Sequence, residues 1–266
     1  MSAITSILFW VAVAAGAFHA AYASANTSFL IVLYLFALLR LAQADQWRKA
    51  FYSGLAVGLL IAAVRLAFFW RLFLGGAAAL WVVYAFWIGL FVALARLCLG
   101  RLGPRWGWVL IPFAWTGLEY FRSELYYLRF SWLNGGYSFA GAPWQGALRL
   151  AGIYGAGLLL VSIASAAAWL WQKSRIQSLA LLCLGTGGVC LTGLLSGKEP
   201  PAHPVAAIRV AGIQMEFPTE KEVLLRLNDL IRSHPETELV VLSEYTFGEP
   251  VPAAVKEWCR THERYL

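Results

Sequence analysis

The sequence predicts an α-helical polytopic membrane domain of about seven transmembrane helices, followed by an incomplete α/β domain. Of its 266 residues 60% are hydrophobic and only 13% are charged, whereas soluble domains are about half apolar and a quarter charged. Near residue 198 the long apolar stretches give way to short strand-like runs that alternate with amphipathic segments. We therefore expect a transmembrane domain over 1–198 and an α/β domain over 199–266.

The apolar stretches divide into seven expected spans, because a helix crosses the hydrocarbon core with about 20 apolar residues. The spans are 3–23, 27–43, 50–72, 76–98, 106–123, 150–172 and 176–196. The first span has no Lys or Arg before Phe9, and a second span follows it closely. We therefore interpret it as a permanent helix rather than a cleaved signal peptide.

Cations fall in alternate loops between the spans. They are Arg48 and Lys49, then Arg101 and Arg105, then Lys173 and Arg175. Loops rich in Lys and Arg lie in the cytoplasm, so the N-terminus is predicted to be cytoplasmic and the α/β part periplasmic. This topology is that of a multi-pass protein of a bacterial inner (cytoplasmic) membrane. Since most Lys and Arg lie at the ends of apolar segments, the net charge of +7 reflects topology rather than a basic face, and we expect the bilayer as a partner and no nucleic acid.

Few polar features interrupt the first four spans. Gly54 and Gly58 form a GxxxG pattern, which is typical of a close contact between two helices. Arg65 and Arg71 lie inside the third span, where we expect them either to snorkel to the interface or to face a polar cavity. The four cysteines show neither a CxxC motif nor a disulfide-type spacing. We therefore infer neither a disulfide nor a metal site from them.

The stretch 112–157 is the most polar part of the membrane half. Trp115, Glu119 and Arg122 recur at intervals of three and four residues, which places them on one face of a helix. A carboxylate and a guanidinium would meet there, near the outer interface. They form either a self-neutralising pair at the helix end or a lipid-headgroup site. The aromatic and Gly-rich loop 130–145 follows, and we expect it to lie on the outer leaflet.

Five short motifs between Pro112 and Gly155 follow in a fixed order: P-x-x-W-x-x-x-E-x-x-R, F-x-W, GYS, P-W-Q and G-x-Y-G. This order resembles the membrane domain of bacterial apolipoprotein N-acyltransferases, although Ser131 replaces the proline usual between Phe and Trp. The resemblance implies seven spans followed by an extracytoplasmic nitrilase-type (carbon–nitrogen hydrolase) domain. It also implies transfer of an acyl chain from a phospholipid to the amino terminus of a diacylated lipoprotein, through a cysteine thioester.

The implied partners are therefore a phospholipid donor and a lipoprotein acceptor, and the implied chemistry needs neither a cofactor nor a metal. On this reading, the phospholipid enters from the outer leaflet. Trp115, Glu119, Arg122 and Tyr137 supply the polar and aromatic face that guides it.

The region after residue 198 predicts the beginning of a βαβ unit. Residues 209–215 and 239–243 are apolar runs typical of buried parallel strands. Between them lies an amphipathic helix whose expected buried side consists of Val223, Leu224, Leu227, Leu230 and Ile231. Glu244 follows the second strand, where an open α/β sheet places its functional groups. The resemblance to nitrilase-type enzymes implies that Glu244 is the general base that deprotonates a cysteine nucleophile.

Two positions in this region depart from the family pattern. Ser243 stands where the family usually has proline, and Met215 to Phe217 stand where the acyltransferases usually have an asparagine. These departures favour an alternative function, namely another membrane-tethered carbon–nitrogen hydrolase or acyltransferase. A non-enzymatic transporter or scaffold is a third possibility, although the membrane part shows no internal repeat of the kind common in transporters.

Lys256 and Cys259 complete the residue types of a nitrilase triad, but we do not assign them to it. They belong to a predicted helix over 252–264, in which Trp258 packs, whereas a nucleophile needs a fixed turn at a strand end. The resemblance implies that the catalytic lysine and cysteine follow on later strands. We therefore expect this chain to be inactive alone, either as the front of a longer product or as half of a split enzyme.

Overall fold

The computed structural model describes residues 3–196, 208–244, 246–248 and 250–266. The chain divides into two compact units, Met1–Glu199 and Pro200–Leu266. The regular elements in the described part of the first unit are all helices, and the second unit combines strands and helices. Each unit is described by itself.

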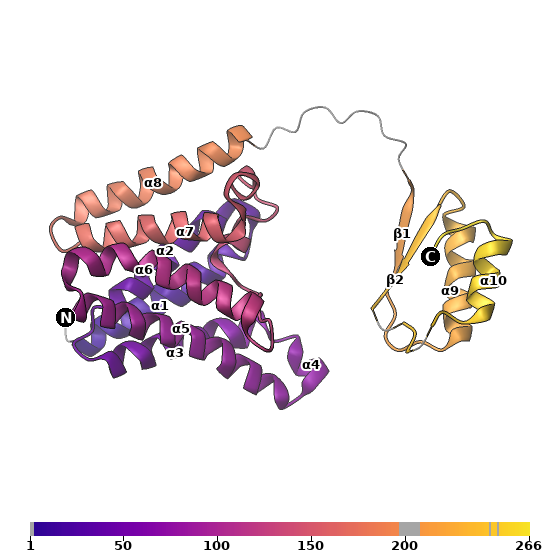
Figure 1. Cartoon of the computed structure of the whole chain (residues 1–266), viewed down its shortest axis with the longest axis horizontal. Coiled ribbons are helices and arrows are strands. Elements are labelled where there is room, and N and C mark those ends of the chain that lie inside the picture. The colour runs from indigo at the N-terminus through magenta and orange to yellow at the C-terminus, as the bar shows by residue number, and fades with distance from the viewer. Residues whose placement is uncertain (1–2, 197–207, 245, 249) are drawn as a thin grey trace. The chain divides into compact units, whose positions relative to one another are not determined.

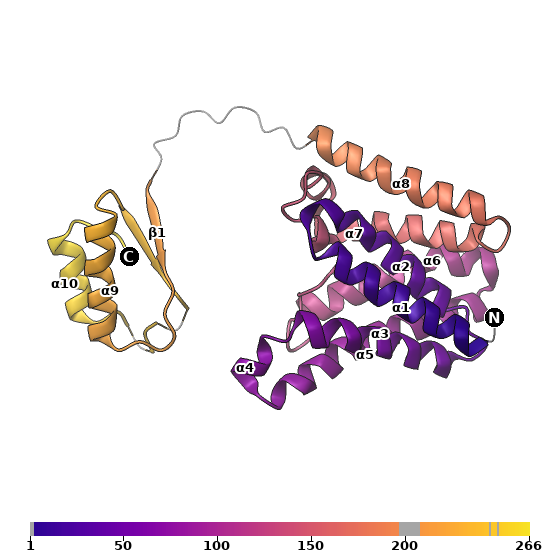
Figure 2. The same ribbon diagram turned by 180° about the vertical axis from the view of Figure 1, so that it is seen from behind.

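The first unit is a bundle of apolar helices (Figure 1). Its elements are α1 (Ala3–Ala21), η1 (Ala25–Leu30), α2 (Ile31–Leu41), α3 (Trp47–Arg65), α4 (Phe69–Phe73), α5 (Gly76–Arg101), α6 (Gly103–Tyr120), η2 (Phe121–Leu125), η3 (Gly135–Phe139), α7 (Gly146–Leu170) and α8 (Arg175–Ser196). Helices α1 and α2 pack on each other, and Figure 2 shows both in the foreground.

Five helices in the described part of the chain are long and apolar enough to cross a membrane, namely α1, α3, α5, α7 and α8. This result confirms a polytopic membrane unit. The expected span 27–43 corresponds to the shorter apolar segment Ala25–Leu41. The expected span 106–123 corresponds to α6 and the π-helical turn η2. The total of seven spans therefore stays a prediction.

The expected span 50–72 is wrong at its C-terminal end, because α3 stops at Arg65 and a separate short helix, α4, follows. The Arg65 guanidinium donates to the backbone carbonyl of Tyr22, at 3.2 Å, and to that of His19. These carbonyls lie at the C-terminal end of α1, where the last turn has no helical donors. Arg65 thus caps the C-terminal end of α1, while Arg71 is exposed on α4. The expected snorkelling of the two side chains stays a prediction.

Helices α3 and α5 approach closely at the GxxxG pattern. A Cβ atom added at Gly58 would lie 2.5 Å from Ala85 Cα, and one added at Gly54 would lie 2.9 Å from Gly89 Cα. Both distances are shorter than any real contact, so only glycine fits at these two positions of α3. The close helix contact predicted from the sequence is confirmed.

A proline inside α6 ties this helix to α7. Pro112 has no N–H group, so the carbonyl of Trp108, four residues earlier, loses its helical donor. The Ser165 hydroxyl of α7 donates to that carbonyl at 2.7 Å. Helix α7 itself bends near its start, where Gly152 adopts φ 67° and ψ 178°.

The second unit contains β1 (Val210–Ile213), α9 (Glu220–Ser233), β2 (Leu239–Leu242) and α10 (Ala253–Thr261). The two strands are parallel, in a register that pairs Val210 with Leu239 and Ile213 with Leu242. Both helices pack on the sheet around a core of Val223, Leu227, Val240, Val255 and Trp258. The expected inner side of α9 is confirmed, since Leu224, Leu230 and Ile231 pack against this core.

The chain returns to the sheet after α10. The predicted helix 252–264 is too long, because α10 ends at Thr261 and Tyr265 already lies parallel to β2. Val240 N–H donates to the Tyr265 carbonyl at 2.8 Å, and Tyr265 N–H donates to the Glu238 carbonyl at 3.0 Å. Alternate residues of β2 bond to β1, so Tyr265 occupies the other edge of this strand.

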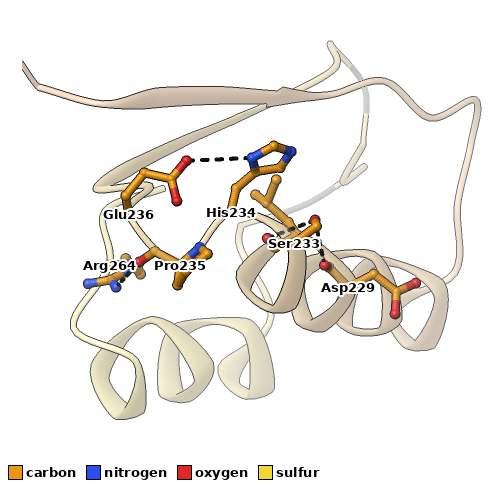
Figure 3. Close-up of polar contacts among 7 residues, drawn as sticks. Asp229, Ser233, His234, Pro235, Glu236 and Arg264 are labelled. Carbon is orange, nitrogen blue, oxygen red and sulfur yellow. Dashed lines mark hydrogen bonds and ion pairs between the residues drawn. The ribbon is translucent and has the colours of Figure 1, made fainter.

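The turn between α9 and β2 is fixed by side chains around Pro235 (Figure 3). Arg264 donates to the Pro235 carbonyl at 2.8 Å, and His234 Nδ1 lies 3.5 Å from Glu236 Oε1. Arg264 thereby connects the segment after α10 to the turn before β2.

Helix α9 begins with a capping box. The Thr219 hydroxyl accepts from Glu222 N–H, and the Glu222 carboxylate accepts from Thr219 N–H at 2.7 Å. The hydrogen bond from the Thr219 backbone holds the pKa of Glu222 below its ordinary value of 4.5.

The first prediction concerns Gly58. Gly58→Ala should lower the stability of the first unit by about 1–3 kcal/mol, because the added methyl group overlaps Ala85 in a packed interface. The matched control is Gly16→Ala in α1, where a Cβ atom has nothing within 4 Å and alanine favours the helix. Thermal unfolding in detergent measures both. Equal melting temperatures for the two variants would contradict the close contact.

The second prediction concerns the capping box. Thr219→Ala should destabilise α9 by about 1 kcal/mol, measured as faster hydrogen exchange of the α9 amides. The control is Lys221→Ala, which removes an exposed side chain from the same turn. The pKa of Glu222 is depressed in the folded state. The contribution of its carboxylate to the stability of α9 is therefore present above the unfolded pKa and is lost as the pH falls below 4.5. Exchange that is insensitive to Thr219 would disprove the role of the cap.

Candidate functional site

The candidate site of the first unit lies where α6 changes into the π-helical turn η2. Trp115 and Glu119 belong to α6, and Arg122 belongs to η2. All three are buried, with exposed fractions of 4%, 4% and 3%. The shared face predicted from their spacing is therefore present, and it points into the protein. A π-helical turn inside a helix is frequent at functional sites.

Glu119 and Arg122 do not form a salt bridge with each other among the described residues, so the expected direct pair is wrong. Both instead bind the loop between α6 and α7. Glu119 Oε1 accepts from Gly135 N–H at 2.7 Å, and Arg122 donates to the side-chain oxygen of Asn134. The Asn134–Gly135 segment thus binds both charges. The Gly135 N–H group faces the carboxylate, and the Asn134 side-chain oxygen faces the guanidinium.

Asn134 is the centre of this hydrogen-bond network and is 1% exposed. Its amide nitrogen donates to Ser123 Oγ at 3.0 Å, and its backbone carbonyl accepts from the Tyr22 hydroxyl at 2.7 Å. Neither Asn134 nor Ser123 is among the residues predicted from the sequence. A signal for Asn134 is present, since it is an amide side chain beside two glycines in an otherwise aromatic loop.

Aromatic rings surround the network. The Arg122 guanidinium carbon lies 5.2 Å from the centre of the Tyr84 ring, which gives a cation–π contact. Trp115 packs edge-on against Phe91, with ring centres 4.6 Å apart. A cavity of about 10 Å³ is bordered by Trp115, Glu119 and Arg122. Its size suits a single water molecule.

Two charged atoms of the network are buried without a hydrogen-bond partner among the described residues, Glu119 Oε2 and Arg122 Nε. Gly157 of α7 leaves room beside the first of them, since a Cβ atom there would lie 3.2 Å from Glu119 Oε2. Unpartnered buried charges are costly. The arrangement therefore has a free acceptor and a free donor available for a water molecule or for a polar group of a ligand.

Tyr137 lies on η3, in the same loop. Its backbone N–H donates to the Asn134 carbonyl at 3.1 Å, but its side chain is not part of this buried network. Its exposed fraction is 38%, against 4% or less for the three other predicted residues. The structure thus brings Trp115, Glu119 and Arg122 together and leaves Tyr137 at the surface of the loop that they hold.

In the second unit, Glu244 directly follows β2 and is exposed. Ser243 before it joins the carboxyl ends of the two strands: its hydroxyl donates to the Met215 carbonyl at 2.7 Å and accepts from Met215 N–H at 3.1 Å. Ser243 N–H also donates to the Ile213 carbonyl at 3.2 Å. The backbone that carries Glu244 is therefore fixed to the end of β1.

Lys256 and Cys259 both lie within α10, and neither is at the end of a strand. Cys259 is half-buried against the core of the second unit. Burial raises the pKa of its thiol, whereas a nucleophilic cysteine needs a lowered pKa. No cluster of His, Cys, Asp and Glu suited to a metal ion occurs among the residues that the structure describes.

A third prediction follows from the role of Asn134. Asn134→Ala should leave the Arg122 guanidinium buried without its acceptor, and losing one partner of a buried charge costs about 3–5 kcal/mol. We expect the loop 130–145 to open and to be cleaved faster by protease in detergent. The control is Tyr127→Ala, because that side chain is 93% exposed. Equal cleavage rates in the two variants would show that the network does not hold the loop.

Comparison with known proteins identifies the membrane unit. A model of the apolipoprotein N-acyltransferase N-terminal domain matches residues 5–166, which include α2 to α6, the Glu119–Arg122 network and most of α1 and α7. The match does not extend to Glu244. A search of curated proteins found no match. Since the matched region covers more than half of the chain, the protein belongs to the apolipoprotein N-acyltransferase family.

Proposed function

We propose that the complete protein transfers an acyl chain from a phospholipid to the amino terminus of a diacylated lipoprotein, through a cysteine thioester. The match of residues 5–166 to the family's N-terminal domain is the observation that carries this proposal. The buried polar network at the end of α6 supports it, because ionised groups inside a membrane protein are usually functional. The second unit would supply part of a nitrilase-type domain.

The proposed location is the bacterial inner membrane, with the N-terminus in the cytoplasm and the second unit in the periplasm. Cations at the predicted cytoplasmic side support this topology: Arg48 lies in the first turn of α3, Arg101 ends α5, and Lys173 lies between α7 and α8. The Glu119–Arg122 network lies at the other end of α6 and would then face the outer leaflet.

The proposed role of the network is to shape the surface that receives the phospholipid. Glu119 and Arg122 hold the Asn134–Gly135 segment, and this segment carries Tyr137 at its surface. Arg122 Nε is a free donor for a phosphate oxygen. Trp115 supports the network from within the bundle. We therefore propose that Arg122 and Tyr137 act on the lipid, while Trp115 and Glu119 position them.

Glu244 is the proposed general base. Its carboxylate takes the proton of a cysteine thiol, and the thiolate attacks the ester carbonyl of the phospholipid. The ester bond breaks, and Glu244 returns the proton to the departing lysophospholipid. The lipoprotein amine then attacks the thioester, the thiolate leaves, and Glu244 takes the amine proton. A lysine would stabilise the oxyanion of each tetrahedral intermediate. We assign neither the cysteine nor the lysine to Cys259 or Lys256.

A catalytic site is usually closed to water, whereas Glu244 is exposed in this unit. The proposal therefore requires that further residues cover it in the complete protein, and the chain 1–266 alone should be inactive. The Ser243 contacts to Met215 favour an alternative acceptor, because they occupy the place of a family proline beside the base. Another extracytoplasmic amine or amide is then the alternative substrate.

A fourth prediction tests the role of Glu244. In the complete protein, Glu244→Gln should lower the rate of acyl-thioester formation by about 10²–10⁴-fold, the usual contribution of a general base. Insertion into the membrane should be unchanged. The assay follows a labelled acyl chain from phospholipid to protein, and then to a diacylated lipopeptide.

The control is Glu236→Gln, another carboxylate of the same unit that is partly exposed at the turn before β2. A normal rate of thioester formation in Glu244→Gln would refute the assigned role. Thioester that forms normally in the unchanged protein but does not pass to the lipopeptide would favour the alternative acceptor.

A further inference from the structure

Two arginines share one tryptophan ring at the cation-rich end of the first unit. Arg40 ends α2, and Arg175 begins α8. Their guanidinium carbons lie 5.6 Å and 5.5 Å from the centre of the Trp171 ring. Arg40 also lies 5.5 Å from the ring of Trp10 on α1. Like charges repel each other, so a negative charge beside the two guanidinium groups would stabilise this grouping.

The described part of the protein supplies no such charge. None of its salt bridges involves Arg40 or Arg175, and the carboxylate of Asp45, the nearest acidic residue to Arg40 along the chain, binds Lys49 at 2.9 Å. Arg40 donates to Gln43 Oε1 at 2.5 Å. Arg40 Nε and Gln43 Nε2 are buried donors without a partner. Two positive charges and two unpartnered donors thus converge where the described residues supply one neutral acceptor, Gln43 Oε1, and no carboxylate.

We propose that this group, consisting of Arg40, Gln43, Arg175, Trp10 and Trp171, binds the phosphodiester headgroup of an anionic phospholipid. Guanidinium groups and amide donors suit phosphate oxygens. Tryptophan rings at the end of membrane helices lie at headgroup level. Basic sites between helices on the cytoplasmic side are typical binding places for anionic lipids. A zwitterionic headgroup would bring an additional positive charge to a site that already has two.

This lipid site is separate from the proposed donor site. Trp10 lies near the middle of α1 and Tyr22 directly follows its C-terminal end, twelve residues away, which corresponds to about 18 Å along a helix. Tyr22 contacts the Asn134 network, whereas Trp10 contacts Arg40. The bound lipid would therefore act as a bridge between α2 and the start of α8, and it would not be the acyl donor.

The test uses the purified protein in a neutral detergent. Binding of phosphatidylglycerol and of phosphatidylcholine is measured by native mass spectrometry, and the readout is the ratio of the two affinities. We expect the unchanged protein to prefer phosphatidylglycerol by at least about tenfold, the effect of one charge-assisted hydrogen bond. Arg40→Gln and Arg175→Gln should each bring the ratio close to one.

The control is Arg48→Gln, which removes an exposed arginine at the same end of the bundle, 5.6 Å from the ring of Trp47. Its ratio should equal that of the unchanged protein. Because the readout is a ratio, a general loss of stability from the missing Trp contacts does not imitate the result. Arg175 is exposed, so its variant should fold even where that of Arg40 does not.

Equal affinity of the unchanged protein for the two lipids would overturn the proposal, as would a preserved ratio in both arginine variants. A separate arm adds inorganic phosphate at millimolar concentration. Phosphate that removes the preference for phosphatidylglycerol would identify a soluble anion as the ligand and would overturn the assignment to a lipid. Phosphate without effect, together with loss of the preference in both variants, would support it.

Discussion

The membrane unit depends on one constraint: polar groups that lie in an apolar medium must find their partners within the protein. The Asn134–Gly135 segment meets this constraint for a carboxylate and a guanidinium at once. It separates two charges that would otherwise attract each other directly. The same two charges also hold the loop between α6 and α7 in a fixed position at the end of the bundle. Loop and helix end therefore form one structural element.

Local patterns predicted much of this fold. Hydrophobic length predicted the apolar helices, and the three- and four-residue spacing predicted the common face of Trp115, Glu119 and Arg122. The partners of these residues could not be predicted, because they come from a loop whose path depends on tertiary packing. The span 50–72 was wrong for a similar reason. Arg65 caps a helix that is distant in sequence, and no local pattern contains that information.

The second unit shows the same limit at its strand ends. Two apolar runs and an amphipathic segment were sufficient to predict β1, α9 and β2. A serine in place of a family proline was visible in the sequence, but its two bonds to Met215 were not. The position of Tyr265 beside β2 also depends on backbone hydrogen bonds to that strand, which the hydrophobic pattern of the sequence does not indicate. Sequence patterns thus determine the elements, whereas their connections depend on single polar contacts.

The bond between Ser165 and the Trp108 carbonyl limits how the bundle can move. Sliding or turning α6 against α7 would break this bond and leave a backbone acceptor unpaired in a medium without water. We therefore expect α6 and α7 to keep their position relative to each other. Helix α4 is short, and its Arg71 and Leu72 are exposed. Displacement within the bundle is thus expected at α4 rather than between α6 and α7.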